Sequence, residues 1–113
     1  MSRTFIICLT APPEIQVACF VGTDNLNEVL GDFTSQINWD NTNEVVKRCA
    51  KLAHEKDYNL FALGMHGLCL SGADMKHKYY INGTDGAYCK DGIGMGNSIF
   101  VYSLGERCFY VIL

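Results

Sequence analysis

The sequence predicts an α+β domain in which one helix packs on an antiparallel sheet and disulfide bonds join the two. Three observations predict this fold. Residues 41–57 carry apolar side chains at helical spacing, the other apolar runs are short enough for strands, and the chain of 113 residues contains six Cys. There is no internal repeat or low-complexity segment, so we expect one domain over residues 1–113.

The composition excludes a disordered chain and argues against sequence-independent binding of nucleic acid. Hydrophobic residues make up 49% of the chain, which is too many for disorder. The net charge is −3 and the pI is near 5.5, whereas binding to phosphate backbones needs clustered Lys and Arg. The basic run at residues 75–79 is expected to be a solvated loop. No apolar segment is long enough for a membrane-spanning helix, so we expect no membrane insertion.

The Cys content favours a disulfide-stapled protein in an oxidising, extracellular compartment. The number of Cys is even, and no two are spaced as Cys-x-x-Cys, which argues against zinc-ribbon and thioredoxin-type sites. The sequon formed by residues 82–84, Asn-Gly-Thr, agrees with secretion. Counting alone leaves every connectivity of six Cys open.

The helix is expected to begin after Asn41. Asn41 is a favourable N-cap residue, and Glu44 three positions later completes a capping box. Trp39 before the cap is expected to pack onto Val45, with a ligand platform as the alternative. Spacings of three and four residues place one set of apolar side chains on a single inward face. This inward stripe consists of Val45, Cys49, Leu52 and Ala53.

The helix is followed by a predicted hairpin. The apolar runs Leu60–Met65 and Leu68–Leu70 are expected to be its strands, and residues 66–67, His-Gly, its turn. Cys49 on the helix stripe and Cys69 on the second strand are then placed to meet. A disulfide between them closes a loop of roughly 20 residues and contributes about 3 kcal/mol in the chain-entropy model.

The remaining strands are expected near the two ends of the chain. Two prolines end a first strand, and residues 22–40 are expected to form a wrapped loop. For the N-terminal run, the remnant of a signal peptide is the alternative. Residues 105–106, Gly-Glu, are expected to join the last two strands as a type II′ hairpin. The four predicted strands are Phe5–Leu9, Gln16–Val21, Ile99–Leu104 and Arg107–Leu113.

The two terminal runs predict the other disulfides and a second copy of the chain. Both runs are apolar and chain ends often lie close together, so Cys8 is expected to bond to Cys108. Cys19 is then left to bond to Cys89. Residues 108–113 show no alternation of apolar and polar side chains, so they must be covered on both faces by the domain or by a second copy. We therefore expect a homodimer.

The long irregular segment from residue 71 to residue 98 carries the best cluster for ligand binding. Sugars are bound by flat aromatic faces together with amide and carboxylate groups, and this segment contains all three. At least one of its tyrosines is expected to cover the sheet instead. The candidate ligand-binding residues are Tyr79, Tyr80, Asn82, Asp85 and Tyr88, with Asn97 and His66 as neighbours.

Two other chemistries are alternatives, a Ca²⁺ site and a Cys–His nucleophile. Asp74, Asp85 and Asp91, with Asn97, are weak candidates for Ca²⁺ ligands, although their order is not that of an EF-hand loop. No cofactor is otherwise expected. A Cys–His nucleophile, with His66 near Cys69, requires a free and accessible thiolate, and disulfide formation is the alternative.

Several short motifs resemble WSC and PAN/apple extracellular modules, as found in small secreted proteins of cnidarians and other marine invertebrates. The resemblance covers residues 17 to 104. It rests on Cys19-Phe20, Arg48-Cys49-Ala50, residues 58–63 (Tyr-Asn-Leu-Phe-Ala-Leu), residues 69–72 (Cys-Leu-Ser-Gly), Cys89 and Val101-Tyr102. It implies a helix cradled on a sheet, a helix Cys bridged to the following hairpin, and binding of carbohydrate or protein at cell surfaces without catalysis.

The sequence therefore leads to one main functional hypothesis and two alternatives. The main hypothesis is a secreted, non-enzymatic, lectin-like module that binds a glycan through the segment from Asp74 to Asn97. The first alternative is a protein-interaction or structural module of the extracellular matrix that uses the apolar C-terminal strand. The second is a cytosolic hydrolase or thiol enzyme. We expect no nucleic-acid partner in any of these cases.

Overall fold

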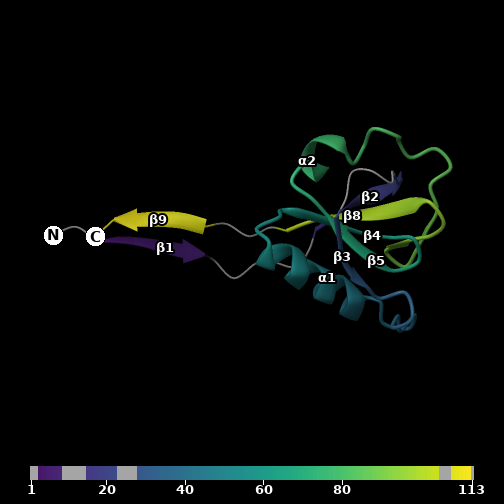
Figure 1. Ribbon diagram of the computed structural model, residues 1–113, viewed down its shortest axis with the longest axis horizontal. Coiled ribbons are helices and arrows are strands. Elements are labelled where there is room, and N and C mark those ends of the chain that lie inside the picture. Colours follow the sequence, from purple (N-terminus) through teal and green to yellow (C-terminus); the bar gives the residue numbers. More distant parts are fainter. Residues whose placement is uncertain (1–2, 9–14, 23–27, 105–107, 113) are drawn as a thin grey trace.

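The computed structural model describes residues 3–8, 15–22, 28–104 and 108–112. It confirms the predicted α+β class, with a helix packed on a five-stranded antiparallel sheet (Figure 1). The strands are β1 (Thr4–Cys8), β2 (Ile15–Val21), β3 (Glu28–Asp32), β4 (Leu60–Gly64), β5 (Leu68–Ser71), β6 (Cys89–Lys90), β7 (Ile93–Gly94), β8 (Ser98–Ser103) and β9 (Cys108–Ile112), and the helices are α1 (Asn43–Glu55) and α2 (Met75–Lys78). No helix in these ranges is long and apolar enough to cross a membrane.

The five-stranded sheet has the strand order β2-β8-β4-β5-β3, and all its neighbours are antiparallel. Its centre is the predicted hairpin of β4 and β5. Strand β3 was missed from the sequence, which placed only a loop there. Its residues Glu-Val-Leu-Gly-Asp include types that disfavour strands, and its pairing with β5 comes from tertiary contact at a sheet edge.

The hydrophobic core has two layers, one on each face of this sheet. Helix α1 covers one face, and α2 with Tyr79 covers part of the other. The predicted inward stripe of α1 is confirmed, because Val45, Cys49 and Ala53 are buried and Leu52 packs against the same cluster. Beneath the helix, the rings of Phe61 and Tyr102 stack with their centroids 5.0 Å apart.

The predicted N-cap of this helix is wrong. Thr42 occupies the cap position, and its side chain makes no capping hydrogen bond. The Thr42 hydroxyl instead donates a hydrogen bond to the backbone oxygen of Asp91 at 2.7 Å, and the Asn41 N–H donates to Asn38 O. The first turn of the helix is thus attached to the distant loop at residue 91 rather than closed by a local capping box.

The end of α1 has the hydrogen bonds of a Schellman motif. Tyr58 N–H donates to Ala53 O at 3.0 Å and Asp57 N–H donates to His54 O at 3.0 Å. Asp57 has a φ of 60°, in the left-handed region that glycine adopts without cost. The motif turns the chain sharply from the helix into β4.

The turn between β4 and β5 lies one residue earlier than predicted. Met65 and His66 have φ values of 48° and 67°, and Gly67 N–H donates to Gly64 O at 2.9 Å, which makes a type I′ turn. Gly67 follows the turn, with a φ of 140°. A Cβ there would lie 2.8 Å from the Ile37 side chain. The glycine is therefore required next to the turn rather than within it.

The predicted hairpin of the last two strands is also wrong. Strand β8 lies between β2 and β4, and β9 pairs with β1 in a separate two-stranded ribbon. The ribbon projects away from the helix and the five-stranded sheet (Figure 1). The turn predicted at residues 105–106 lies outside the described residues. The sequence showed that both runs are strands, but local spacing does not decide which strands pair.

Two of the predicted disulfides are confirmed. Cys49 bonds to Cys69 with a Cα–Cα distance of 5.4 Å, and Cys19 bonds to Cys89 with a Cα–Cα distance of 6.1 Å. For the third, the register places Cys8 directly opposite Cys108 in the β1–β9 ribbon, while their side chains lie outside the described part of the structure. The two disulfides indicate an oxidising environment.

Candidate functional site

The candidate site lies at the end of the sheet where the β4–β5 turn meets the turn before β8, and we call it the turn end (residues 64–67 and 94–98). His66 joins the two turns. Its N–H donates to Gly94 O at 2.9 Å, and its Nε2 accepts a hydrogen bond from Gly96 N–H at 3.3 Å. The imidazole is thereby held beside exposed Asn97.

Tyr88 is attached to the same turn end through its backbone. Its N–H donates to Ser98 Oγ at 2.8 Å, and its carbonyl oxygen accepts from Met95 N–H at 2.9 Å. The next residue, Cys89, is bonded to Cys19 on β2. The Tyr88 side chain is nevertheless 62% exposed. It is an aromatic ring in solvent on a backbone that is fixed from both sides.

The segment that contains Asn82 reaches the same end of the sheet. Val21 N–H donates to Gly83 O at 2.9 Å, and Gly22 N–H donates to Asn97 O at 2.6 Å. Because Val21 and Gly22 are consecutive, the backbones around Asn82 and Asn97 are held side by side at the end of β2. The side chains of Asn82 and Asn97 are both exposed.

The other predicted tyrosines lie near α2 instead. Tyr79 is half-buried, and its ring meets Phe20 edge-on with centroids 5.1 Å apart. It is therefore a tyrosine that covers the sheet. Tyr80 is 56% exposed and touches Tyr79 edge-on at 5.4 Å. Asp85 is exposed in a turn where Ala87 N–H donates to Thr84 O.

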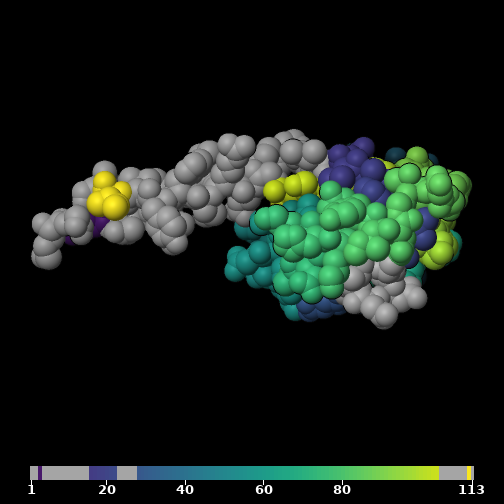
Figure 2. Space-filling model, turned by 90° about the horizontal axis from the view of Figure 1, so that it is seen from above, coloured from purple at the N-terminus to yellow at the C-terminus, as the bar shows by residue number. Residues whose placement is uncertain are grey.

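The predicted cluster is thus divided. His66, Asn97 and Tyr88 come together at the turn end, with Asn82 beside them, whereas Tyr79 and Tyr80 lie at the end of α2. Figure 2 shows the segment that follows β5, in green, spread across one face of the body, with β2 in dark purple beside it. The sequence places these residues close together along the chain, but the disulfide and the backbone contacts distribute them over this face.

The three Asp residues considered for Ca²⁺ do not form a cluster. Within the described ranges, no three His, Cys, Asp or Glu side chains gather as a metal site. The Asp74 side chain is 71% exposed and lies 3.9 Å from the Lys78 amine. Asp91 has a φ of 50° and its backbone oxygen accepts from Thr42. Their positions reflect turns and a local ion pair.

Lys90 and Met65 are not among the predicted site residues, and Trp39 is predicted as a ligand platform only as an alternative. Trp39 is 38% exposed, and the Lys90 amine lies 5.1 Å from the centre of its ring. Lys90 is two residues after Tyr88, so this contact links Trp39 to the segment that carries the Tyr88 ring. Met65, 40% exposed, adds an apolar group on the β4–β5 turn. The contact of Lys90 with Trp39 joins residues that are far apart in the sequence, and no local spacing signals it.

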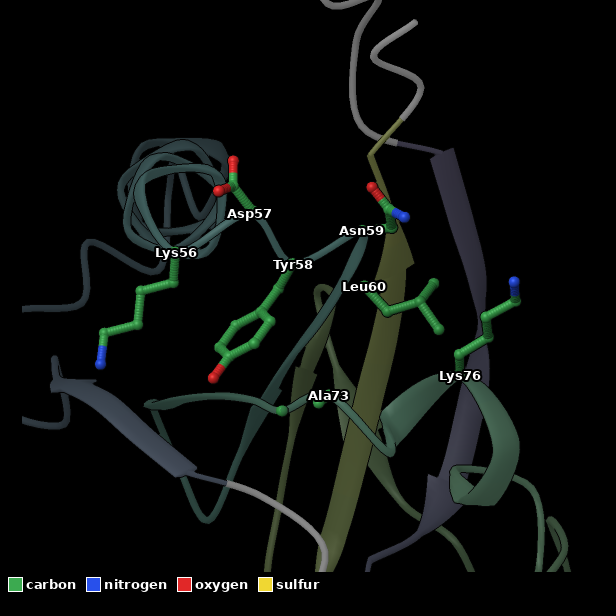
Figure 3. A pocket seen from close by; sticks show the side chains of 8 residues that line it. Lys56, Asp57, Tyr58, Asn59, Leu60, Ala73 and Lys76 are labelled. Carbon is green, nitrogen blue, oxygen red and sulfur yellow. The ribbon is translucent and has the colours of Figure 1, made fainter. Parts of the chain in front are cut away.

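A cleft of about 280 Å³ at the opposite end of the sheet was also missed (Figure 3). It opens between the end of α1, the start of β4 and the start of α2. The Tyr58 hydroxyl donates to Glu28 at 3.0 Å, and Lys56 forms an ion pair with the same carboxylate. The lining residues are Lys56, Asp57, Tyr58, Asn59, Leu60, Gly72, Ala73 and Lys76.

The contacts of Glu28 shift the titration of all three groups. The hydrogen bond from Lys56, followed by that from Tyr58, lowers the pKa of Glu28 below its ordinary value of 4.5. The hydrogen bonds to Glu28 raise the pKa of Lys56 and the pKa of Tyr58. At neutral pH the carboxylate is therefore charged, and it holds both neighbours in place.

The catalytic alternative has no free thiol at the residues proposed for it. Cys49 and Cys69 are joined in a fully buried disulfide, so Cys69 is not a thiolate next to His66. No model of a known protein family matches the chain, and no curated protein matches it either. The site has to be judged from its geometry.

Proposed function

We propose that the chain is a secreted, non-enzymatic, lectin-like module that binds a glycan at the turn end. The observation that carries this proposal is the Tyr88 ring, which is 62% exposed on a backbone held by two hydrogen bonds and the adjacent Cys19–Cys89 disulfide. An aromatic side chain has only two rotatable bonds, so on a fixed backbone it loses little conformational entropy on binding. It is therefore well suited to stack against the C–H face of a sugar ring.

The groups around Tyr88 support the same ligand class. The exposed amides of Asn82 and Asn97 supply donors and acceptors for hydroxyl groups, and Trp39 adds a second aromatic surface. His66 is fixed beside Asn97 by its two contacts with residues 94 and 96. Exposed groups of this kind suit one or two sugar residues at the end of a chain.

Backbone strain at the turn end also supports a binding role. Met65 and His66 are consecutive, exposed, and both left-handed, which costs an L-residue roughly 1–2 kcal/mol. Residues in such conformations cluster at ligand sites. Asn and Gly would relieve the strain, but they would remove the imidazole and the apolar side chain that the turn presents.

The secreted location and the module type are part of the proposal. The two disulfides support an oxidising compartment, and the Cys49–Cys69 bridge between helix and hairpin is the one that the PAN/apple resemblance implies. In the sequence, both residues of that bridge lie between Cys19 and Cys89, which form the other bridge. We therefore propose a PAN/apple-like module as the framework of the glycan site.

Retention on immobilised glycans tests the proposal. We expect Tyr88→Ala and Asn97→Ala to lose retention, because they remove the stacking surface and an amide. Their melting temperatures should stay within a few degrees of wild type, as is usual for exposed side chains. Tyr80→Ala is the matched control, since Tyr80 is similarly exposed at 56% but lies at the end of α2.

The result that contradicts the site is equal retention of wild type and Tyr88→Ala on every glycan that binds. Loss of retention in Tyr80→Ala but not in Tyr88→Ala would move the site to α2. If wild type is retained on no glycan surface, the lectin proposal fails and a protein-interaction module becomes the better account.

The β1–β9 ribbon favours protein interaction as a second candidate function, with another copy of the chain as the partner. A two-stranded sheet is marginally stable alone, and no other described strand pairs with the free edges of β1 and β9. Neither strand contains a charged residue, Pro or Gly to discourage pairing. Light scattering after gel filtration should give a dimer. Ile112→Lys, at a site that is 71% exposed, should shift it to monomer.

A further inference from the structure

The cleft at the end of α1 combines a fixed ring with apolar surfaces. Figure 3 shows Tyr58 and Leu60 at the cleft, with Ala73 below them and the two lysines on opposite sides. Glu28 accepts a hydrogen bond from the Tyr58 hydroxyl, so the ring is held in one orientation. Ala73 and Gly72 offer almost no side chain, which leaves the space beside the ring open.

Within the described part of the chain, the cleft also presents a cation that has no anionic partner, Lys76. Lys56 is paired with Glu28. Among the residues that the structure describes, no carboxylate lies within ion-pairing distance of the Lys76 amine, and Lys76 is exposed. The neighbouring residues His77 and Lys78 add to the basic character of α2. An anionic group that enters the cleft would find its charge partner at Lys76.

We propose that this cleft binds a small ring-shaped carboxylate, with the ring between Tyr58 and Leu60 and the carboxylate at Lys76. A volume of about 280 Å³ is at the lower end for ligand pockets, so the ligand is a single ring rather than a chain of rings. The shared chemistry is a six-membered ring that bears one carboxylate, and it is found in aromatic acids and in sugar acids. This site is separate from the turn end and does not depend on glycan binding there.

Titrations followed by amide NMR shifts test the proposal with two matched pairs of probes. Benzoate is compared with neutral benzamide, and methyl glucuronide with neutral methyl glucoside. We expect at least one carboxylate to shift the amides of residues 57–60 and 72–76 and to bind roughly tenfold more tightly than its neutral partner, as one charged contact allows. If the benzoate pair shows the difference, the ligand is an aromatic acid. If the glucuronide pair shows it, the ligand is a sugar acid.

Lys76→Met keeps the aliphatic stem and removes the charge. It should reduce the difference between carboxylate and neutral probe to less than about threefold. Lys47→Met is the control, because Lys47 is an exposed lysine on α1, nine residues before Lys56 and so roughly 13 Å along the helix. Lys47→Met should bind the probes as wild type does.

Tyr58→Leu separates the contact with the ligand ring from the contact between the carboxylate and Lys76. It should weaken both members of the pair, because it removes the ring surface, while the preference for the carboxylate remains. Well-dispersed spectra of each variant show that it is folded, and Tyr58→Phe, which keeps the ring, is the second variant if Tyr58→Leu unfolds. Equal binding of charged and neutral probes, or shifts at the turn end in place of the cleft, would overturn the proposal.

Discussion

The two disulfides connect the sheet to different kinds of structure. Cys49–Cys69 joins α1 to β5, and both residues are fully buried in the core under the helix. Cys19–Cys89 joins the edge strand β2 to the loop that carries Tyr88, and both residues are half-buried. Cys49–Cys69 is part of the packing that stabilises the domain, and Cys19–Cys89 holds the candidate site against the edge of the sheet.

Loop length and burial give opposite answers to the question of which disulfide contributes more to stability. The sequence separations are 20 and 70 residues, so the chain-entropy model gives about 3 and about 4 kcal/mol. Burial makes Cys49–Cys69 the more important of the two, because removing its sulfurs leaves a cavity in a close-packed core. The comparison therefore separates what a crosslink does to the unfolded chain from what it does to the folded one.

The largest expected effect is that of Cys49→Ala with Cys69→Ala. The loss of about 3 kcal/mol of chain entropy adds to a cavity cost of at least about 2 kcal/mol, and the sum is comparable with the whole stability of many domains. We expect the variant to be largely unfolded at 37 °C by circular dichroism. A variant that melts within 10 °C of wild type, with both measured alike, would show that the helix packs without its bridge.

The second effect is that of Cys19→Ser with Cys89→Ser. The chain-entropy model gives a loss of up to about 4 kcal/mol, but the core under α1 keeps its packing. Hydrogen exchange should therefore increase at residues 84–98 far more than at residues 45–53, and glycan retention should be lost. If exchange rises equally in both segments, Cys19–Cys89 stabilises the whole domain and does not act mainly on the site.

Much of the fold was predictable because its signals are local and repeat with a clear period. The spacing of Val45, Cys49 and Ala53 defines the buried face of α1, and the two short apolar runs after it define β4 and β5. These two patterns bring Cys49 to Cys69. The exposed aromatic character of the loop could also be predicted from Tyr80 and Tyr88.

What could not be predicted depends on contacts between segments that are far apart in the sequence. The Thr42 hydroxyl bonds to residue 91 instead of closing its own helix, and β9 pairs with β1 at the other end of the chain. The cleft is formed where residues 56–60 meet residues 72–76. No local period carries such information, so neither the Lys76 cleft nor the left-handed Met65 could be predicted from the sequence.

Asp57→Gly is expected to have a smaller effect, which acts only at the end of α1. Asp57 is left-handed with a φ of 60° at the end of α1, where its charge also opposes the helix dipole. Glycine removes both costs and should raise the stability by about 0.5–1 kcal/mol in a urea titration. Glycan retention should not change, since the turn end is elsewhere. A loss of stability would mean that the Asp57 side chain has a stabilising contact that outweighs the strain.

The smallest expected effect concerns stability as a function of pH. It arises from the contacts of Glu28 with Lys56 and Tyr58, close to the end of α1. Lys56 and then Tyr58 lower the pKa of Glu28 below 4.5 in the folded chain. A lowered pKa means that the stabilisation is complete above the pKa of the unfolded state and is lost as the pH falls through that of the folded state.

Melting temperatures measured from pH 7 to pH 3 should therefore fall less for Glu28→Gln than for wild type, by no more than a few degrees because the groups are exposed. Thr34 also lowers the pKa of Asp32, so both proteins lose stability in this range, and only the difference between them reports on Glu28. Identical curves for the two proteins would mean that the ion pair with Lys56 and the hydrogen bond from Tyr58 contribute nothing measurable. The orientation of the Tyr58 ring in the cleft would then have to depend on its packing alone.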